Sequence, residues 1–403
     1  MRPLLLLLSA SLLLASPVHA QAPLSQLVGP WRLSLDLEGA ELRSRMEVQR
    51  GAAGTEARLC HAAACDPAYP LALVGDSVVF EVADYAATIT LAVRGDSLIG
   101  WYRNVGNRGP RTIPFRAARG SYPRHSAPTA VAGRWDAWFQ GVTGSSPRVI
   151  EFREGPAGFE GSLISNTGDY GRFGGAVRGD TLTLSRFDGS FVYHLEARVK
   201  GDSLVGIFRA GLRAATPFVA RRSTGAPHLA DPQTLTRADT AAAFQFSFRD
   251  TDGRLVTQDD PRFKGRVVLV DIFGTWCPTC HEAAEALVAL HKEFAPRGVA
   301  FVGLAYEVSG DSAVDGALVR RYRARFDVPF PLLLAGRNDV DAAAATLPQL
   351  DGFTSFPTTL FLDRSGRVRR VHAGFYGPST GARHTAQIAD FRAMLESLLN
   401  GPS

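Results

Sequence analysis

The stretch "VVLVDIFGTWCPTCH", residues 267–281, decides how the C-terminal part of the chain folds. Residues 267–273 are apolar apart from one aspartate, which is typical of a strand buried on both faces of a sheet. Cys277 and Cys280 follow with the spacing Cys-x-x-Cys, and they are two of only four cysteines in the chain. The spacing by itself is compatible with a redox dithiol, a c-type haem attachment site or half of a metal site.

The residues after this stretch predict further strands and helices in alternation. Apolar positions at helical spacing follow Cys280, and residues 299–306 predict a second buried strand. The remaining expected elements are an inserted helix over 315–326, a hairpin of strands 358–362 and 367–372, and a closing helix around 388–398. Alternating strands and helices predict an α/β domain with a mainly parallel sheet over residues 241–403.

The region before this domain contains an internal repeat. "GPWRLSLDL" (29–37) recurs as "GRWDAWFQG" (133–141), and "RGDSLIGWYR" (94–103) recurs as "KGDSLVGIFR" (200–209). Four such matches keep the same order at offsets of 103 to 106 residues, which indicates a duplicated domain rather than a short structural repeat. Short strands joined by Gly-Asp turns predict an antiparallel barrel or sandwich in each copy.

The sequence therefore predicts a multidomain protein with two tandem antiparallel β domains ahead of the α/β domain. The β domains are expected over residues 21–123 and 129–223, and a linker rich in Pro, Thr, Ala and Asp over 224–240. Neither β domain shows a cluster of titratable residues, so we expect a folding or partner-binding role, with the partner unknown.

Cys60 and Cys65 lie in the first β domain as "CHAAACDP" and have no counterpart in the second. In an exported protein, two neighbouring cysteines most often form a small structural disulfide. Cys60, His61 and Cys65 are also possible metal ligands, but a structural zinc site needs a fourth ligand, and the nearby sequence does not supply one. We expect the disulfide and no metal.

The N-terminus predicts export. Arg2 is followed by an apolar run over residues 4–15 and by Val18-His19-Ala20, the pattern of a secretory signal peptide cleaved after Ala20. A membrane span needs roughly 20 apolar residues, and this run is shorter. The expected location is outside the cytoplasm, in the periplasm if the organism is Gram-negative, where disulfides persist.

The overall charge does not point to a nucleic acid partner. The chain has 44 Lys and Arg against 39 Asp and Glu, a formal net charge of +5, and these residues are scattered along its 403 residues. A basic balance without clusters is typical of a mixed-charge solvated surface.

The C-terminal region resembles the TlpA/ResA-like family of exported thioredoxin-fold thiol–disulfide oxidoreductases. The features that carry the resemblance are "VVLVDIFGTWCPTC", the helical insert after the next strand, and "SFPTTLFLDRSGRV" (355–368). The resemblance covers about residues 240–400 and leaves the repeated region outside. It implies a reductase of protein disulfides that a membrane electron donor keeps reduced, with cytochrome c maturation as one setting, and no cofactor.

The chemistry of a dithiol explains the spacing of the two cysteines. At a helix start, the positive end of the helix dipole favours a thiolate at the first sulfur. Cys277 is therefore expected to be an exposed nucleophile that forms a mixed disulfide, and Cys280 the thiol that resolves it. Because Cys280 must lose a proton, a buried carboxylate is needed nearby. By resemblance two residues qualify: Asp271, which we favour, and Glu307 as a second contributor.

The resemblance also assigns residues around the dithiol to substrate binding. Phe356-Pro357-Thr358 matches the loop that carries a cis-proline in thioredoxin folds. This loop is expected to face Cys277 and to offer backbone for pairing with a substrate peptide. Trp276 is expected to shield the sulfur pair and to present a flat surface to the substrate.

Three other interpretations of the chain are possible. In a c-type haem protein, "CPTCH" would attach haem and His281 would be its axial ligand. In a peroxiredoxin-like peroxidase, threonine and proline are needed where this chain has Gly274 and Val270. In a non-catalytic scaffold, the β domains would bind a partner and the dithiol would only sense redox state. We favour the oxidoreductase because Cys277, Cys280, Asp271 and Pro357 are all present.

Overall fold

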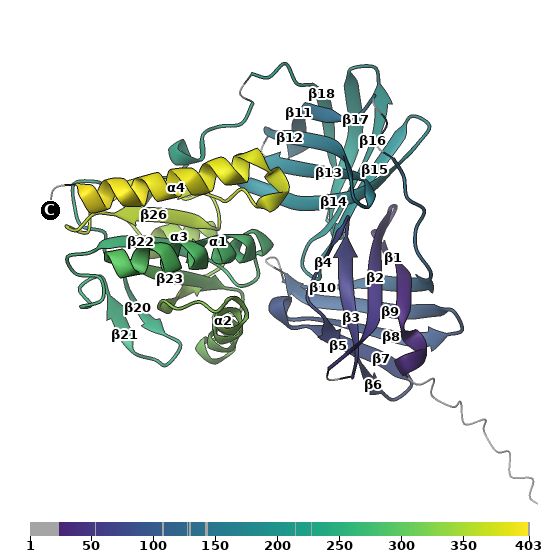
Figure 1. The fold of residues 1–403 in the computed structure, drawn as a ribbon, viewed down its shortest axis with the longest axis horizontal. Helices are drawn as coiled ribbons and strands as arrows, with labels where there is room; N and C mark the ends of the chain where they lie inside the picture. The colour runs from purple at the N-terminus through teal and green to yellow at the C-terminus, as the bar shows by residue number, and fades with distance from the viewer. Residues whose placement is uncertain are drawn as a thin grey trace, which may run out of the picture.

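The computed structural model describes residues 24–401, except 53, 107–108, 127, 129, 142–143, 214 and 227. It contains two β domains and an α/β domain, and one end of helix α1 (Pro278–Phe294) points toward the two β domains (Figure 1). The predicted signal peptide, residues 1–20, lies outside the described residues. Among the helices of the described part, none is long and apolar enough to cross a bilayer.

The first β domain is an open antiparallel sheet of ten strands, in the order β4-β3-β2-β1-β10-β9-β8-β7-β6 with β5 paired to β3. The antiparallel prediction is confirmed, but this sheet does not close into a barrel. Its elements are η1 (Leu24–Leu27), β1 (Gly29–Asp36), β2 (Glu41–Gly51), β3 (Gly54–His61), β4 (Ala64–Cys65), β5 (Tyr69–Pro70), β6 (Ala72–Val74), β7 (Ser77–Val82), η2 (Ala83–Tyr85), β8 (Ala87–Arg94), β9 (Ser97–Gly106) and β10 (Gly109–Arg119).

The second β domain is a closed antiparallel barrel of strands β11 to β18 in sequence order. Alternating residues of these strands fill its interior, as in other small barrels. The strands are β11 (Gly133–Gly141), β12 (Gly144–Gly155), β13 (Gly158–Ser165), β14 (Gly168–Arg178), β15 (Thr181–Phe187), β16 (Val192–Lys200), β17 (Ser203–Ala210) and β18 (Thr216–Arg222).

The two β domains place equivalent residues in equivalent contacts. Trp31 in β1 and Trp135 in β11 are both buried, and each indole N–H donates to the carbonyl four residues upstream, at 2.8 and 2.9 Å. An arginine of the last strand lies over each indole ring, Arg119 at 4.5 Å and Arg222 at 4.4 Å from the centroid. The repeated sequence motifs therefore occupy matching positions in the two sheets.

One strand distinguishes the two domains. In the barrel, β14 bridges β13 and β15, whereas in the first domain the short strands β4, β5 and β6 occupy that part of the chain and leave the sheet open. The hairpin of β15 and β16 fills this open side. Phe187 and Val192, which flank the turn of that hairpin, belong to the hydrophobic core of the first domain, and the Phe187 ring packs edge-on against Tyr102 at 5.1 Å.

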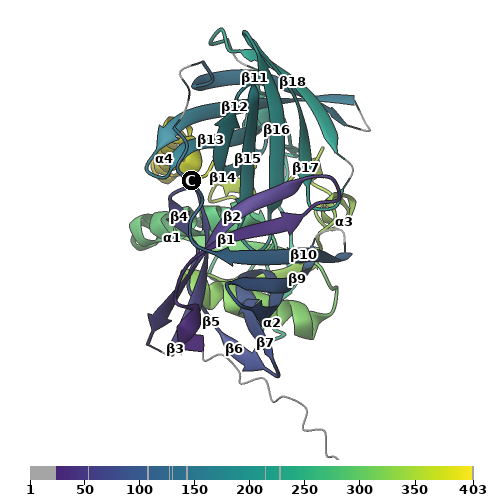
Figure 2. The ribbon, with the colours of Figure 1, turned by 90° about the vertical axis from the view of Figure 1, so that its right-hand side faces the viewer.

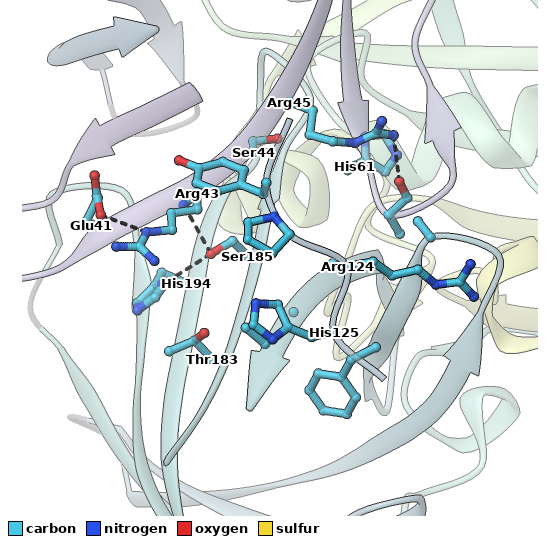
Figure 3. Close-up of a pocket in the computed structure, with 18 of the residues that line it drawn as sticks. Glu41, Arg43, Ser44, Arg45, His61, Arg124, His125, Thr183, Ser185 and His194 are labelled. Carbon is cyan, nitrogen blue, oxygen red and sulfur yellow. Dashed lines mark hydrogen bonds and ion pairs between the residues drawn. The ribbon is translucent and has the colours of Figure 1, made fainter. Parts of the chain in front are cut away.

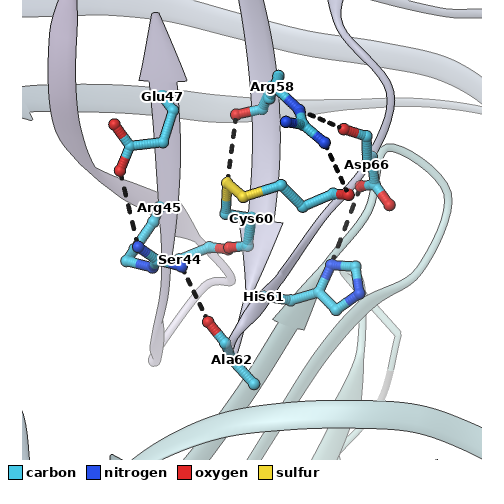
Figure 4. Close-up of a disulfide and its surroundings, with 9 residues drawn as sticks. Ser44, Arg45, Glu47, Arg58, Cys60, His61, Ala62 and Asp66 are labelled. Carbon is cyan, nitrogen blue, oxygen red and sulfur yellow. Dashed lines mark hydrogen bonds and ion pairs between the residues drawn. A yellow bond between two sulfur atoms is a disulfide. The ribbon is translucent and has the colours of Figure 1, made fainter. Parts of the chain in front are cut away.

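The first domain carries a disulfide between Cys60 in β3 and Cys65 in β4 (Figure 4). The two residues are direct cross-strand partners, and their Cα atoms lie 4.0 Å apart. Arg58 donates to the carbonyl of Asp66 at 2.9 Å, which fastens the chain just beyond the bridge. This is the pairing that the sequence predicts. It lies in the part of the first domain that corresponds to β14 of the barrel.

Removing this disulfide is expected to weaken the first domain. A Cys60→Ala/Cys65→Ala double substitution should lower its free energy of unfolding by about 2 kcal/mol, because the bridge closes only a short loop and constrains the unfolded chain accordingly. Urea unfolding followed by intrinsic fluorescence measures the change. Reduction of the wild-type protein serves as the comparison, and an unchanged transition midpoint would show that the bridge contributes no stability.

The α/β domain contains a seven-stranded sheet in the order β21-β20-β24-β23-β22-β26-β27. Its central strands β22, β23 and β24 are parallel, and β26 pairs antiparallel with β22. The elements beside α1 are β20 (Ser247–Asp250), β21 (Leu255–Thr257), β22 (Val267–Phe273), η4 (Ala295–Arg297), β23 (Val299–Glu307), α2 (Ser312–Phe326), β24 (Leu332–Arg337), α3 (Val340–Thr346), β26 (Thr358–Leu362), β27 (Val368–Ala373), η5 (Pro378–Thr380) and α4 (Ala382–Asn400).

The predicted strands, inserted helix, hairpin and closing helix of this domain are all confirmed. The segment expected to be a linker contains structure of its own. Within it lie η3 (Pro232–Thr234) and β19 (Arg237–Ala238), and β19 pairs with β25 (Leu350–Asp351) of the α/β domain. The linker therefore ends before residue 237 rather than at residue 240.

Candidate active site

The two cysteines lie at the N-terminus of α1. Cys277 is the residue that caps the helix, and Pro278 occupies its first turn, where a missing N–H costs nothing. The Cys277 sulfur accepts the backbone N–H of Cys280 at 3.4 Å. This backbone N–H and the positive end of the helix dipole both favour a negative charge on the sulfur. The geometry therefore suits Cys277 as the nucleophile of the pair.

Both cysteines are free thiols, and both are buried. Cys280 is fully buried, as a resolving thiol is expected to be, and burial together with the neighbouring Cys277 sulfur raises its pKa well above the ordinary value. Only 6% of the Cys277 surface is exposed. The prediction that Cys277 is an exposed nucleophile is therefore wrong, because its side chain packs among buried residues of the α/β domain and beside the Phe356 carbonyl.

Asp271 is the only charged residue of β22, and 4% of its surface is exposed. Burial raises the pKa of its carboxyl group to about 7. Within the described residues, its Oδ1 atom has no hydrogen-bond partner. Its charge acts on the Cys280 thiol and raises the pKa of that group. A carboxylate with a free oxygen and a pKa near neutrality is able to accept a proton from Cys280.

Glu307 ends the neighbouring strand β23 and is 1% exposed, so it is not a residue of a surface loop. Both of its oxygens accept hydrogen bonds from Thr275, one from the backbone N–H at 2.8 Å and one from the hydroxyl at 2.7 Å. Burial raises the pKa of its carboxyl group to about 8, against the effect of these two bonds. Glu307 therefore fastens the loop that leads to Cys277.

The loop before β26 faces Cys277, and its Phe356–Pro357 peptide bond is cis. The carbonyl oxygen of Phe356 lies 3.8 Å from the Cys277 sulfur. Trp276 packs edge-on against Phe356 at 5.7 Å, and its indole N–H donates to a backbone carbonyl of β23. The Thr358 side chain is fully buried, and its hydroxyl donates to the Ser355 carbonyl at 2.8 Å, so only its backbone remains for a substrate.

His281 does not fit the haem interpretation. Its ring stacks on Tyr85 of the first β domain at 4.8 Å and packs edge-on against Tyr322. Its Nε2 atom lies 2.7 Å from the carbonyl oxygen of Thr275. An axial ligand needs a free ring nitrogen with open space beside it, and this ring has neither. In the described residues, no group of three His, Cys, Asp or Glu side chains is placed to hold a metal ion.

Several residues of this site were not anticipated from the sequence. Thr275 connects Glu307 to His281, and Tyr85 reaches the site from another domain. Glu282, directly after His281, is partly buried, and desolvation with the nearby Asp169 raises the pKa of its carboxyl group to about 8. From the sequence alone, a glutamate near the start of a helix is expected to be solvated unless the docking of another domain is known.

A separate cavity of about 490 Å³ lies between the two β domains (Figure 3). Arg43, Ser185 and His194 line it, and Ser185 contacts the His194 ring at 3.1 Å. None of the residues 267–281 or 355–358 lines this cavity. It is therefore not part of the dithiol site.

Comparisons with known proteins agree with this geometry. Residues 237–386 match the Redoxin family. The thioredoxin-like protein YneN of Bacillus subtilis is 28% identical over 129 residues, 32% of this chain and 68% of that protein. The thiol-disulfide oxidoreductase ResA of Halalkalibacterium halodurans is 26% identical over 144 residues, 35% of this chain and 72% of that protein. A chloroplastic peroxiredoxin Q of Oryza sativa subsp. japonica is 29% identical over 149 residues, 37% and 64% of the two chains.

A thioredoxin-type sheet with a Cys-x-x-Cys pair at the start of α1 defines the class of thiol–disulfide oxidoreductases, and the chain is an enzyme of this class. Its C-terminal domain is similar to the TlpA/ResA-like thioredoxin-fold proteins. The two β domains lie outside the region that these relatives match.

Proposed function

We propose that the protein reduces disulfide bonds of exported proteins with its Cys277–Cys280 dithiol. One observation carries the proposal: Cys277 caps α1 with its sulfur on a backbone N–H, while the carboxylate of Asp271 with its unpartnered oxygen acts on Cys280. This arrangement supplies a nucleophile, a resolving thiol and a proton acceptor within one buried cluster.

The reaction has two exchange steps. The Cys277 thiolate attacks one sulfur of the substrate disulfide, a mixed disulfide forms, and the other substrate sulfur leaves as a thiolate that takes a proton from water. Cys280 then passes its proton to Asp271 and attacks the Cys277 sulfur, which releases the second substrate thiolate. Two electrons have passed to the substrate, and Cys277 and Cys280 end as a disulfide.

A partner must return the enzyme to its dithiol form after each turnover. In an exported protein, an electron donor in the membrane is the proposed source of these two electrons, because a disulfide persists in that compartment unless a donor reduces it. Export rests on the predicted signal peptide over residues 1–20. Haem-binding cytochrome precursors, whose Cys-x-x-Cys-His sites must be reduced, are one class of proposed substrate.

Trapping of the mixed disulfide tests this proposal. A Cys280→Ser variant, incubated with oxidised insulin-type substrates, should accumulate a covalent adduct that dithiothreitol releases, because no thiol remains to resolve it. The matched control is Cys277→Ser/Cys280→Ser, which should give no adduct although Cys60 and Cys65 are unchanged. Non-reducing electrophoresis reads out both. If the control traps substrate equally well, another cysteine is the nucleophile.

Peroxide reduction is the second candidate, because a peroxiredoxin Q is among the matched proteins. Reduced enzyme mixed with hydrogen peroxide distinguishes the two activities. We expect consumption no faster than that of an ordinary free thiol, since the chain has Gly274 where the peroxide pocket needs a threonine.

A further inference from the structure

Residues before, between and after the two cysteines contact the β domains. The residue before Cys277 is Trp276, whose carbonyl oxygen accepts the Ser190 hydroxyl of the barrel at 3.3 Å. Between the cysteines, the Thr279 hydroxyl donates to the carbonyl of Asp169, also in the barrel, at 3.4 Å. The residue after Cys280 is His281, on which Tyr85 of the first β domain stacks.

The barrel segment above Trp276 is firmly held. Ser190 lies in the turn of the β15–β16 hairpin, and Phe187 and Val192, which flank this turn, are buried in the core of the first domain. The Tyr102 hydroxyl donates to the carbonyl of Gly189 at 2.8 Å, and Arg111 donates to the carbonyl of Ser190. The hairpin tip is therefore fixed by the first domain at the position where it covers Trp276.

A second set of contacts joins the barrel to the loop after β27. Asp169 accepts the backbone N–H of Gly377 at 2.7 Å with one oxygen and the hydroxyl of Ser379 with the other. The carbonyl of Ser379 in turn accepts the Ser162 hydroxyl of β13 at 3.3 Å. These bonds hold the α/β domain against the barrel (Figure 2).

We propose that the two β domains form a cap that closes the dithiol site, and that Cys277 reacts only when this cap separates from the α/β domain. Three observations support the proposal together: the 6% exposure of Cys277, the contacts from two domains to Trp276, Thr279 and His281, and the clamped hairpin tip. The contacts are mostly polar, and polar interfaces between domains of one chain separate more readily than large apolar ones.

The cap would control which disulfides the enzyme reduces. With two domains docked on the residues beside Cys277, a protein disulfide has no room to approach its sulfur, so a substrate or partner must bind the open form and shift the population toward it. The observed rate is then the rate of the open form multiplied by its fraction. Control over which disulfides are reduced rests on the proposed reductase function. The closure of the dithiol site by the β domains does not depend on it.

Alkylation measures closure without any disulfide substrate. In a Cys280→Ser background, Cys277 is the single free thiol of the full chain. Its rate of reaction with N-ethylmaleimide should be on the order of 100-fold slower in the native protein than in the urea-unfolded protein. Addition of Tyr85→Ala and Asp169→Ala should raise the native rate by about 10-fold or more, because each removes contacts of the cap.

Two controls accompany this experiment. Trp101→Ala, at an exposed position of β9, should leave the alkylation rate unchanged. If the double variant does not fold, Tyr85→Ala and Asp169→Asn are measured singly, and each should raise the rate by a smaller factor. A native rate of the Cys280→Ser protein within about threefold of its unfolded rate, or a rate that folded cap variants do not change, would overturn the proposal. Slow alkylation in a protein without reductase activity would instead contradict the proposed function alone.

Discussion

Replacement of Cys277 by serine is expected to abolish disulfide reduction. A serine side chain has no sulfur with which to form a disulfide, so no mixed disulfide forms. Activity on insulin, with dithiothreitol as the electron source and its background subtracted, should fall below about 1% of the wild-type value. The same loss is expected with a small disulfide, which shows that the chemistry rather than substrate access is lost.

The matched control replaces the other cysteine pair. A Cys60→Ala/Cys65→Ala variant should keep its reductase activity, because that disulfide lies in the first β domain and not in the dithiol cluster. Reductase activity retained by Cys277→Ser would contradict the assignment of the nucleophile. Loss of activity in the Cys60 and Cys65 variant would instead make the second pair part of the electron path.

Replacement of Asp271 by asparagine is expected to slow the resolution step by about 100-fold, the lower part of the range for a removed general base. The wild-type rate should fall as the pH drops below about 7, since burial raises the pKa of the Asp271 carboxyl group to about 7 and a protonated acid cannot accept a proton. The variant should lose this step in its pH profile. Stopped-flow decay of a preformed mixed disulfide, followed across pH 5 to 9, measures both effects.

Glu307→Gln is the matched comparison, because Glu307 is also buried with a raised pKa. Its oxygens are occupied by Thr275, so the variant should keep the pH step of the wild-type protein near 7. If the step disappears in Glu307→Gln and persists in Asp271→Asn, Glu307 is the acceptor and the assignment is reversed.

Asp271→Asn should also stabilise the fold at alkaline pH. The carboxyl group binds its proton more tightly in the folded state, so the wild-type protein loses stability as the pH rises through about 7. Moving a carboxyl pKa from its ordinary value of 3.8 to about 7 corresponds to roughly 4 kcal/mol. Urea unfolding should therefore show a larger gain for the variant at pH 8 than at pH 4.

The α/β domain could be predicted element by element because its signals are local. An apolar run over 267–273 can be a strand at the centre of a sheet, and the cysteines that follow lie where α1 begins. The contact between the Phe356 loop and Cys277 was predicted from the resemblance to the TlpA/ResA-like family, because no spacing in the sequence indicates it. Asp271 was recognisable because a lone carboxylate in such a strand is costly to bury and calls for an explanation.

The closure of the site could not be predicted in this way. The contact of Tyr85 with His281 joins residues 196 positions apart in different domains, and no periodicity reports it. The exposure of Cys277 was also predicted wrongly, since the spacing of a Cys-x-x-Cys pair does not report how tightly the surrounding side chains pack on the first sulfur. The open first sheet was also missed. The sequence of the first domain matches that of the barrel at four places. The counterpart of β14, which the first domain lacks, lies between those matches.

Because Phe187 and Val192 of the barrel are buried in the first sheet, the two halves of the duplication cannot move apart without exposing a hydrophobic core to water. If the β domains separate from the α/β domain, they must therefore move together as one rigid body of some two hundred residues, about the connecting segment between β18 and β19. A ligand bound anywhere on this rigid body, even far from the dithiol, would then alter the accessibility of the two sulfur atoms.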